Sequence, residues 1–209
     1  MRALVGHALG EIDPCIHLNA DLLGPVARGE RSSEYEEWLN RYDGKLDTSR
    51  EDFVQHHKGK YGGNLPVWAA VEVLDWGMLT HLYSMSPNAA RDKVADAVNL
   101  TSPQLESWLK ALNIVRNIAA HHGRMYNRVY GKTPRLPRRE THPEVLFCVG
   151  AMNRIFGQAT LIQYLLRVLK VGNLKILPSV FKTFPENEIV PFWSTGAPDG
   201  WIQSGLWKL

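Results

Sequence analysis

The sequence predicts an all-α fold, and three observations support this class. Apolar residues recur at helical spacing, most clearly at Val67, Val71, Leu74, Met78 and Leu82. Residues that commonly begin or end helices flank several such stretches. No segment alternates apolar and polar residues in the manner of a half-buried strand. Apolar residues make up 44% of the 209 residues, so the chain is able to form a packed core.

The first part of the chain is predicted to contain one helix followed by irregular structure. Residues 1–23 show a helical apolar pattern, which we expect to be interrupted near Pro14. Residues 24–63 are polar and contain several glycines. Within them only E-Y-E-E-W-L at 34–39 is amphipathic, so we expect loops with short helices.

A long buried helix is predicted next. Asn64 is a suitable cap and Pro66 suits a first turn, and the apolar spacing then continues to Tyr83. A shorter helix is expected over 88–98.

The second half begins with another long helix, predicted over 103–130. Thr101 or Ser102 caps it, and Pro103 lies in its first turn. The basic, proline-bearing stretch P-R-L-P-R-R after it is expected to form a rigid loop.

A third long helix is predicted to start at a capping box formed by Thr141 and Glu144 and to end near Lys170. The tail from Val171 onward should pack on the helices through its aromatic residues. Its prolines and tryptophans are Pro178, Pro185, Pro191, Pro198, Trp193, Trp201 and Trp207. We therefore expect a single domain, residues 1–209, built on three long helices with a packed tail.

Cysteine content and hydropathy indicate a cytoplasmic protein with no membrane segment. Cys15 and Cys148 are far apart and form no paired motif, which argues for a reducing compartment and against a disulfide scaffold or a zinc site. The first residues contain too short an apolar run for a signal peptide. No stretch approaches the roughly 20 apolar residues of a membrane-spanning helix.

The charge is unevenly distributed. The chain has a formal net charge of only +3, but residues 107–139 contain eight basic residues and no acidic one. The basic residues are Lys110, Arg116, Arg124, Arg128, Lys132, Arg135, Arg138 and Arg139. Such a basic segment on an otherwise acidic chain is typical of a protein that binds a polyanion.

Within this segment, R-N-I-A-A-H-H-G-R-M-Y-N-R at 116–128 is expected to continue the helix. At 100° per residue it then has two polar stripes and one apolar face. The first stripe contains Asn117, His121, Arg124 and Arg128, and the second contains Arg116, Ala120, Gly123 and Asn127. The apolar face, which should dock on the core, contains Val115, Ile118, His122, Met125 and Val129. The small residues of the second stripe leave room for another helix or a ligand.

This arrangement is suited to phosphodiester chemistry. Asn117 precedes His121 by one helical turn and is expected to fix its tautomer. Arginine holds phosphate oxygens and histidine moves protons. The segment offers no carboxylate for Mg²⁺, so we expect no metal and no cofactor, with the RNA 2′-OH as nucleophile. Simple RNA binding and a structural role remain alternatives. His56, His57 and His81 have no partners at metal-ligand spacing.

The motifs also resemble a known family. R-N-I-A-A-H matches the R-x₄-H motif of HEPN ribonucleases, and the longer block S-W-L-K-A-L-N-I-V-R-N-I-A-A-H-H-G-R-M-Y-N-R resembles the Abi-like abortive-infection proteins of bacteria (AbiD and AbiF type). P-V-W-A-A-V-E-V-L-D-W-G-M-L-T-H-L-Y and G-A-P-D-G-W-I-Q-S-G-L-W-K are similar to two further segments of that family. The resemblance covers most of 60–209, and 1–23 matches an earlier family helix. Family members usually have additional N-terminal helices, which this chain is expected to lack.

The resemblance implies a HEPN-like helical bundle and assigns roles to individual residues. Arg116 and His121 become catalytic, with Asn117 orienting His121. The residues expected to bind RNA are Arg124, Tyr126, Asn127, Arg128, Lys132 and Arg135. For Tyr126, core packing is an equally good interpretation. Glu72 is expected either to support Arg116 or Arg124 or to face solvent, and His122 to support the site from the apolar face.

Three functions follow from this reading. The leading one is a metal-independent, toxin-like endoribonuclease of anti-phage defence, active as a homodimer whose two R-x₄-H helices meet. The first alternative is an RNA-binding protein without catalysis, and the second is a structural helical dimer. The resemblance also implies an antitoxin, either a protein or a small RNA.

Overall fold

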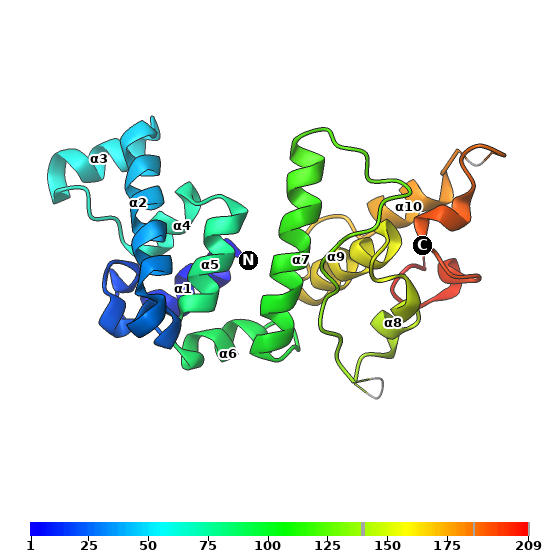
Figure 1. Cartoon of the computed structure of the whole chain (residues 1–209), viewed down its shortest axis with the longest axis horizontal. Coiled ribbons are helices and arrows are strands. Elements are labelled where there is room, and N and C mark those ends of the chain that lie inside the picture. Colours follow the sequence, from blue (N-terminus) through cyan, green and yellow to red (C-terminus); the bar gives the residue numbers. More distant parts are fainter. Residues whose placement is uncertain (139–140, 186, 209) are drawn as a thin grey trace. The chain divides into compact units, whose positions relative to one another are not determined.

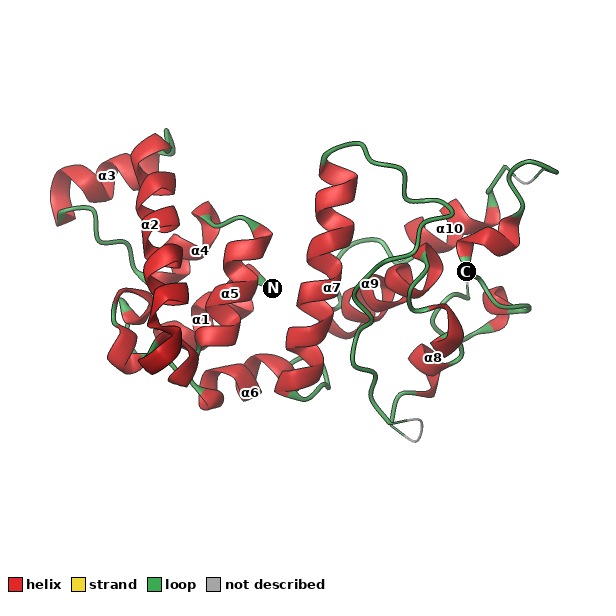
Figure 2. Ribbon diagram, viewed as in Figure 1, coloured by secondary structure: helices red, strands yellow, loops and turns green. Residues whose placement is uncertain are grey.

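The computed structural model of the chain is helical, with loops and turns between the helices (Figures 1 and 2). It describes residues 1–138, 141–185 and 187–208, and within these no strand is present. The predicted all-α class is therefore confirmed. The chain divides into two compact units, Met1–Asp96 and Ala97–Leu209, while the single domain predicted over 1–209 stays a prediction.

The N-terminal unit contains six α-helices. They are α1 (Arg2–Gly10), α2 (Ser32–Thr48), α3 (Asp52–Tyr61), α4 (Val67–Val73), α5 (Trp76–Met85) and α6 (Asn88–Asp96). Helix α1 packs against α4 and α6, and α2 packs against α5. The short helix predicted over 88–98 is confirmed as α6.

The region before α4 differs from its prediction. Helix α1 ends at Gly10, and short 3₁₀ turns replace the rest of the helix predicted over 1–23. Conversely, α2 is a long helix where only a short piece at 34–39 was expected. Its buried residues Tyr35, Trp38, Tyr42 and Leu46 continue the helical spacing past that piece. The many charged residues between them obscured this periodicity in the sequence.

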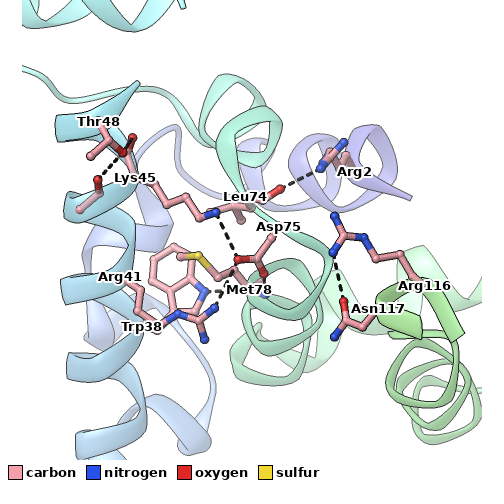
Figure 3. Close-up of polar contacts among 11 residues, drawn as sticks. Arg2, Trp38, Arg41, Lys45, Thr48, Leu74, Asp75, Met78, Arg116 and Asn117 are labelled. Atoms are coloured by element: carbon pink, nitrogen blue, oxygen red, sulfur yellow. Dashed lines mark hydrogen bonds and ion pairs between the residues drawn. The ribbon is translucent and has the colours of Figure 1, made fainter. Parts of the chain in front are cut away.

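The single buried helix predicted from Pro66 to Tyr83 is wrong, because it breaks at Leu74 and Asp75. Leu74 is extended (φ −71°, ψ 140°), and the Asp75 carboxylate caps α5 by accepting a hydrogen bond from the Met78 N–H at 2.9 Å. The Leu74 carbonyl accepts a hydrogen bond from the Arg2 guanidinium at 2.8 Å (Figure 3). Every apolar residue that carried the prediction is nevertheless buried, since both short helices keep their faces on the core.

Asp75 also joins α5 to α2. Its Oδ2 lies 3.3 Å from Arg41 Nη2 and 3.3 Å from Lys45 Nζ (Figure 3). Partial burial alone would raise the pKa of this carboxyl, but the Met78 N–H and the two cations lower it below its ordinary value. The break between α4 and α5 is therefore stabilised by charge as well as by the cap.

A buried histidine lies in the aromatic core of this unit. The ring of His17 is edge-on to Tyr42 at 5.3 Å, and its Nε2 is 3.4 Å from the Tyr42 hydroxyl. Trp38 stacks on Tyr42 at 5.4 Å and donates its indole N–H to the Met78 carbonyl. His17 Nδ1 has no hydrogen-bond partner among the described residues. Burial lowers the pKa of His17 to about 4, so the neutral ring is the stable form.

The described residues of the C-terminal unit form four α-helices. They are α7 (Ser102–Ala120), α8 (Pro143–Leu146), α9 (Ile155–Leu169) and α10 (Ile176–Lys182). Helix α9 packs against α7 and α8. The third long helix was predicted from Thr141, and it begins only at Ile155. Thr141 does not cap a long helix: the helix that follows is the short α8, its N-cap is His142, and the Thr141 hydroxyl donates to the Arg138 carbonyl.

Glycine accounts for the close approach just before α9. A Cβ on Gly157 would lie 2.3 Å from the Ala151 carbonyl oxygen and 2.6 Å from Met152 Cα. The 3₁₀ turn Val149–Ala151 is thus able to lie directly against the first turn of α9.

The tail packs on the helices, as predicted. Trp207 stacks on Phe156 of α9 at 4.5 Å, and Trp201 and Phe181 contact the same ring edge-on. Trp193 is the exception, since 72% of it is exposed. The aromatic residues therefore attach most of the tail to α9.

We expect the buried His17 to make folding sensitive to acid. In the unfolded chain the pKa of His17 returns to about 6.5. Between about pH 6.5 and pH 4, His17 is therefore mostly protonated in the unfolded state and mostly neutral in the folded state. The free energy of unfolding should fall by about 2 kcal/mol between pH 7.5 and pH 5 from this group. Urea unfolding at the two pH values measures it. His17→Gln should remove this share of the pH dependence, whereas His81→Gln, on the exposed side of α5, should retain it.

Candidate functional site

The candidate site is built on α7. A capping box of Thr101 and Gln104 begins the helix, with Pro103 in the first turn. One face of α7 is buried, through residues that include Leu105, Trp108, Leu109, Leu112 and Val115. Arg116 and Asn117 lie on the exposed side. Burial of the apolar face thus fixes which side of the helix presents the polar motif.

Helix α7 ends at Ala120, ten residues before the predicted end. His121 is the C-cap, and His122 adopts the left-handed conformation with φ 52°. The His122 N–H donates to the Ala119 carbonyl at 3.1 Å, and the Gly123 N–H donates to the Ile118 carbonyl at 2.8 Å. These two bonds form a Schellman motif, which satisfies the last carbonyls of the helix.

The three faces predicted for a continuous helix are therefore wrong beyond Ala120. His122 is exposed and so does not lie on a buried face as predicted. Its support of the site stays a prediction. Val129, expected in the core, is 60% exposed. Gly123 does not lie on an open helical stripe, because a Cβ there would be 2.9 Å from Ile118 Cγ2.

The polar motif itself remains exposed at the end of α7. Arg116 Nη1 donates to Asn117 Oδ1 at 3.0 Å (Figure 3). The side-chain oxygen of Asn117 thus has Arg116 as a partner, and the Asn117 backbone carbonyl accepts from the His121 N–H at 3.1 Å. The predicted orientation of the His121 ring by Asn117 stays a prediction.

The segment after α7 is irregular and partly anchored. The Tyr126 hydroxyl donates to the Pro191 carbonyl at 2.9 Å, and its ring lies against Phe184 at 5.5 Å. Asn127 Oδ1 accepts from Arg154 Nη1 at 3.4 Å. Tyr126 therefore packs on the tail, in line with the alternative interpretation of this residue. Contacts of Tyr126 and Asn127 with RNA stay predictions.

The remaining basic residues divide between two places. Arg124 and Arg128 are exposed close to the end of α7, and Arg128 Nη1 donates to the Arg124 carbonyl at 3.4 Å. Lys132 and Arg135 lie in the following loop and line a pocket beside the first half of α7. Ser107 and Lys110 also line this pocket, although no site role was predicted for either. Arg139 lies outside the described residues.

Glu72 belongs to the N-terminal unit and is exposed on α4. It lines an open hollow of about 530 Å³ together with Lys45, Ser49, Glu51, Phe53 and Val73. Its charge also acts on the N-terminal amine of Met1, whose pKa is lowered overall by burial. Its support of Arg116 or Arg124 stays a prediction.

The described residues contain neither a membrane-spanning helix nor a cluster of metal-binding side chains. No helix in this part of the chain is long and apolar enough to cross a membrane. No group of three or more His, Cys, Asp or Glu side chains is placed to hold a metal ion there.

A family model described as Abi-like protein matches residues 1–127. The chain belongs to the Abi-like protein family. The match ends beside Asn127, so it includes the whole N-terminal unit, α7 and the Schellman motif. The resemblance seen in the sequence is thereby confirmed for the Abi-like family, which links the chain to abortive infection and phage defence. No match was found among curated proteins or among solved structures.

We expect the left-handed residue at the end of α7 in this Abi-like chain to control stability. His122→Val should lower the free energy of unfolding by about 1–2 kcal/mol, because a β-branched residue is strained at φ 52°. His122→Gly should not lower it, since glycine adopts this conformation without strain. Chemical unfolding measures both. His121→Val is the matched control, because its φ of −100° is accessible to any residue. An equal loss in both valine variants would contradict the assignment.

Proposed function

We propose that this Abi-like protein is a metal-independent endoribonuclease of anti-phage defence. The observation that carries the proposal is the exposed group of Arg116, Asn117 and His121 at the end of α7, within a segment that contains no carboxylate. A guanidinium is able to stabilise the negative charge that develops on a phosphodiester during cleavage, and an imidazole is able to accept and donate protons in the same reaction. The resemblance of R-N-I-A-A-H to the HEPN ribonuclease motif supports the same chemistry.

The proposed reaction uses the nucleophile of the RNA itself. His121 accepts the proton of the 2′-OH, and the 2′-oxygen attacks the adjacent phosphorus. Arg116 stabilises the negative charge of the pentacoordinate intermediate. The bond to the 5′-oxygen then breaks, and that oxygen receives a proton from a histidine. The products are a 2′,3′-cyclic phosphate and a 5′-hydroxyl, with no oxidant or metal needed.

Asn117 has a supporting role in this mechanism. Its Oδ1 holds Arg116 Nη1 at 3.0 Å, which restricts the long arginine side chain before RNA arrives. An arginine that is already positioned loses less entropy when it meets the phosphate. We therefore add the orientation of Arg116 to the role predicted for Asn117 at His121.

A dimer completes the proposed site. His121 follows Arg116 by five positions, which is about 140° around a helix, and as the C-cap of α7 it is the last residue to which this spacing applies. One subunit alone therefore directs the two side chains away from a common phosphate. A two-fold arrangement of the α7 ends places the His121 of one subunit near the Arg116 of its partner.

RNA binding without cleavage is the second candidate function. The observation that favours it is the basic pocket beside the first half of α7, which lies apart from His121 along the helix. A small RNA held there would serve as an antitoxin, and a protein antitoxin is the other form of restraint that the family resemblance implies. Analysis of cleavage products separates the two functions.

We expect His121→Ala to abolish RNA cleavage and to leave folding largely unchanged, because the side chain is exposed. Arg116→Ala should lower both rate and affinity, since it contacts charge in the ground state and the transition state. The assay is cleavage of a labelled RNA with mapped cut sites.

The controls for this assay address the nucleophile and the metal. A substrate with a single 2′-deoxy substitution at the cut should not be cleaved there, and EDTA should have no effect. Cleavage of the deoxy substrate, or inhibition by EDTA, would show that the metal-free mechanism is wrong.

We also expect the active protein to be a homodimer in solution. Light scattering combined with activity at the same concentrations measures this. A mixture of His121→Ala and Arg116→Ala should be more active than either variant alone, because one of the two composite sites in the mixed dimer keeps both residues. A strictly monomeric protein with full activity would refute the composite site.

A further inference from the structure

A second polar site lies beside the first half of α7. It is a pocket of about 260 Å³ lined by two segments of the C-terminal unit. Pro103, Glu106, Ser107 and Lys110 come from α7, and Lys132 and Arg135 come from the loop that follows. Its position differs from that of the Arg116–His121 group, which lies at the other end of the same helix.

The loop side of this pocket is held in place by hydrogen bonds to α7. The Arg135 N–H donates to Ser107 Oγ at 2.9 Å, and the Trp108 indole N–H donates to the Arg135 carbonyl at 2.8 Å. The Gln104 amide donates to the Leu136 carbonyl at 3.5 Å. These bonds fix the backbone and leave the Arg135 side chain to act in the pocket. A ligand therefore meets cations whose backbone is already ordered, which reduces the entropy lost on binding.

The charge of the pocket favours an anion. Lys110 forms an ion pair with Glu106, so this carboxylate is neutralised. In the part of the chain that the structure describes, no ion pair engages the side chain of Lys132 or of Arg135. Three cations against one carboxylate leave a net charge of +2. The Ser107 hydroxyl adds a neutral donor, because a hydroxyl that accepts one hydrogen bond still carries its O–H.

We propose that this pocket binds a backbone phosphate of the RNA strand and acts as an anchor remote from the cleavage site. Arginine and lysine together are the side chains that proteins use for phosphate oxygens, and the contact reads no base. The proposal rests on RNA being the ligand of the Arg116–His121 site, and it deepens that function by adding a second contact point.

The geometry of α7 gives the spacing of the two contacts. Lys110 and Asn117 are seven residues apart, which is about 10 Å along the helix and only about 20° around it. Both therefore lie on one side of α7. A stacked strand advances about 3.4 Å per nucleotide, so the anchored phosphate is about three nucleotides from the one at Asn117. Strands too short to span this distance occupy only one of the two contacts.

The test is the dependence of affinity on RNA length. The probes are fluorescein-labelled 2′-O-methyl oligouridylates of four and eight nucleotides, which lack a free 2′-OH and are not cleaved. Fluorescence anisotropy measures binding to the full chain and to Lys132→Gln/Arg135→Gln. The matched control Lys175→Gln/Lys182→Gln removes two exposed charges at the ends of α10, elsewhere in the same unit.

We expect the unaltered protein and the control to bind the longer strand at least about tenfold more tightly than the shorter one, the gain typical of one charge-assisted contact. The Lys132→Gln/Arg135→Gln variant should lose this gain. Its logarithmic salt dependence with the longer strand should be shallower by about 0.7, the share of one phosphate. Lys132→Gln alone should lose part of the gain, and it alters no backbone hydrogen bond of the loop.

Three outcomes would overturn the anchor. In the first, the variant keeps the gain with length. In the second, it loses the same factor for both strands, which indicates long-range attraction without a pocket contact. In the third, the α10 control loses as much as the variant. Because the readout is binding, an absence of RNA cleavage would refute the proposed nuclease and leave the anchor standing.

Discussion

The end of α7 is the constraint on which the candidate site depends. Two hydrogen bonds, from the N–H groups of His122 and Gly123 to the carbonyls of Ala119 and Ile118, close the helix. They place His121 at the boundary between regular and irregular backbone, where its side chain is exposed. Had the helix continued, His122 and Val129 would have shared its buried face. Because the Schellman motif ends the helix, the segment from 121 onward is irregular and its side chains do not follow the helical spacing.

A similar principle applies in the N-terminal unit, where a helix break supplies polar groups that the structure uses. The Leu74 carbonyl, left outside α4, accepts from Arg2, and Asp75 caps α5 while it attracts Arg41 and Lys45. In both units a helix ends within a stretch whose apolar spacing would allow it to continue. Local hydrogen bonds to backbone groups override that spacing, because an unpaired buried carbonyl or N–H is costly.

These breaks explain which features were predictable from the sequence. Apolar spacing correctly identified the buried residues Val67 and Val71 of α4 and Met78 and Leu82 of α5, but of the apolar face predicted at the end of α7 only Val115 is buried. The aromatic tail correctly indicated packing on α9. Spacing gave no warning of the end of α7, because His122 takes the left-handed conformation while the glycine that commonly marks it stands one residue later. A helical projection places Asn117 one turn before His121. It does not show that the adjacent Arg116 donates a hydrogen bond to the Asn117 side chain. Tyr126 is bonded to Pro191, and Asn127 is bonded to Arg154. These partners are too distant in sequence for any local pattern to reveal them.

The attachment of the loop to α7 has a consequence for the lifetime of the protein. The loop contains Lys132, Arg135 and Arg138, all residues after which trypsin-like proteases cut. Such enzymes require an extended, detached backbone, and here the N–H and carbonyl of Arg135 are both bound to α7. The peptide bonds beside Arg135 are accessible only when these hydrogen bonds open, so local unfolding of the loop sets the rate at which the chain is nicked there.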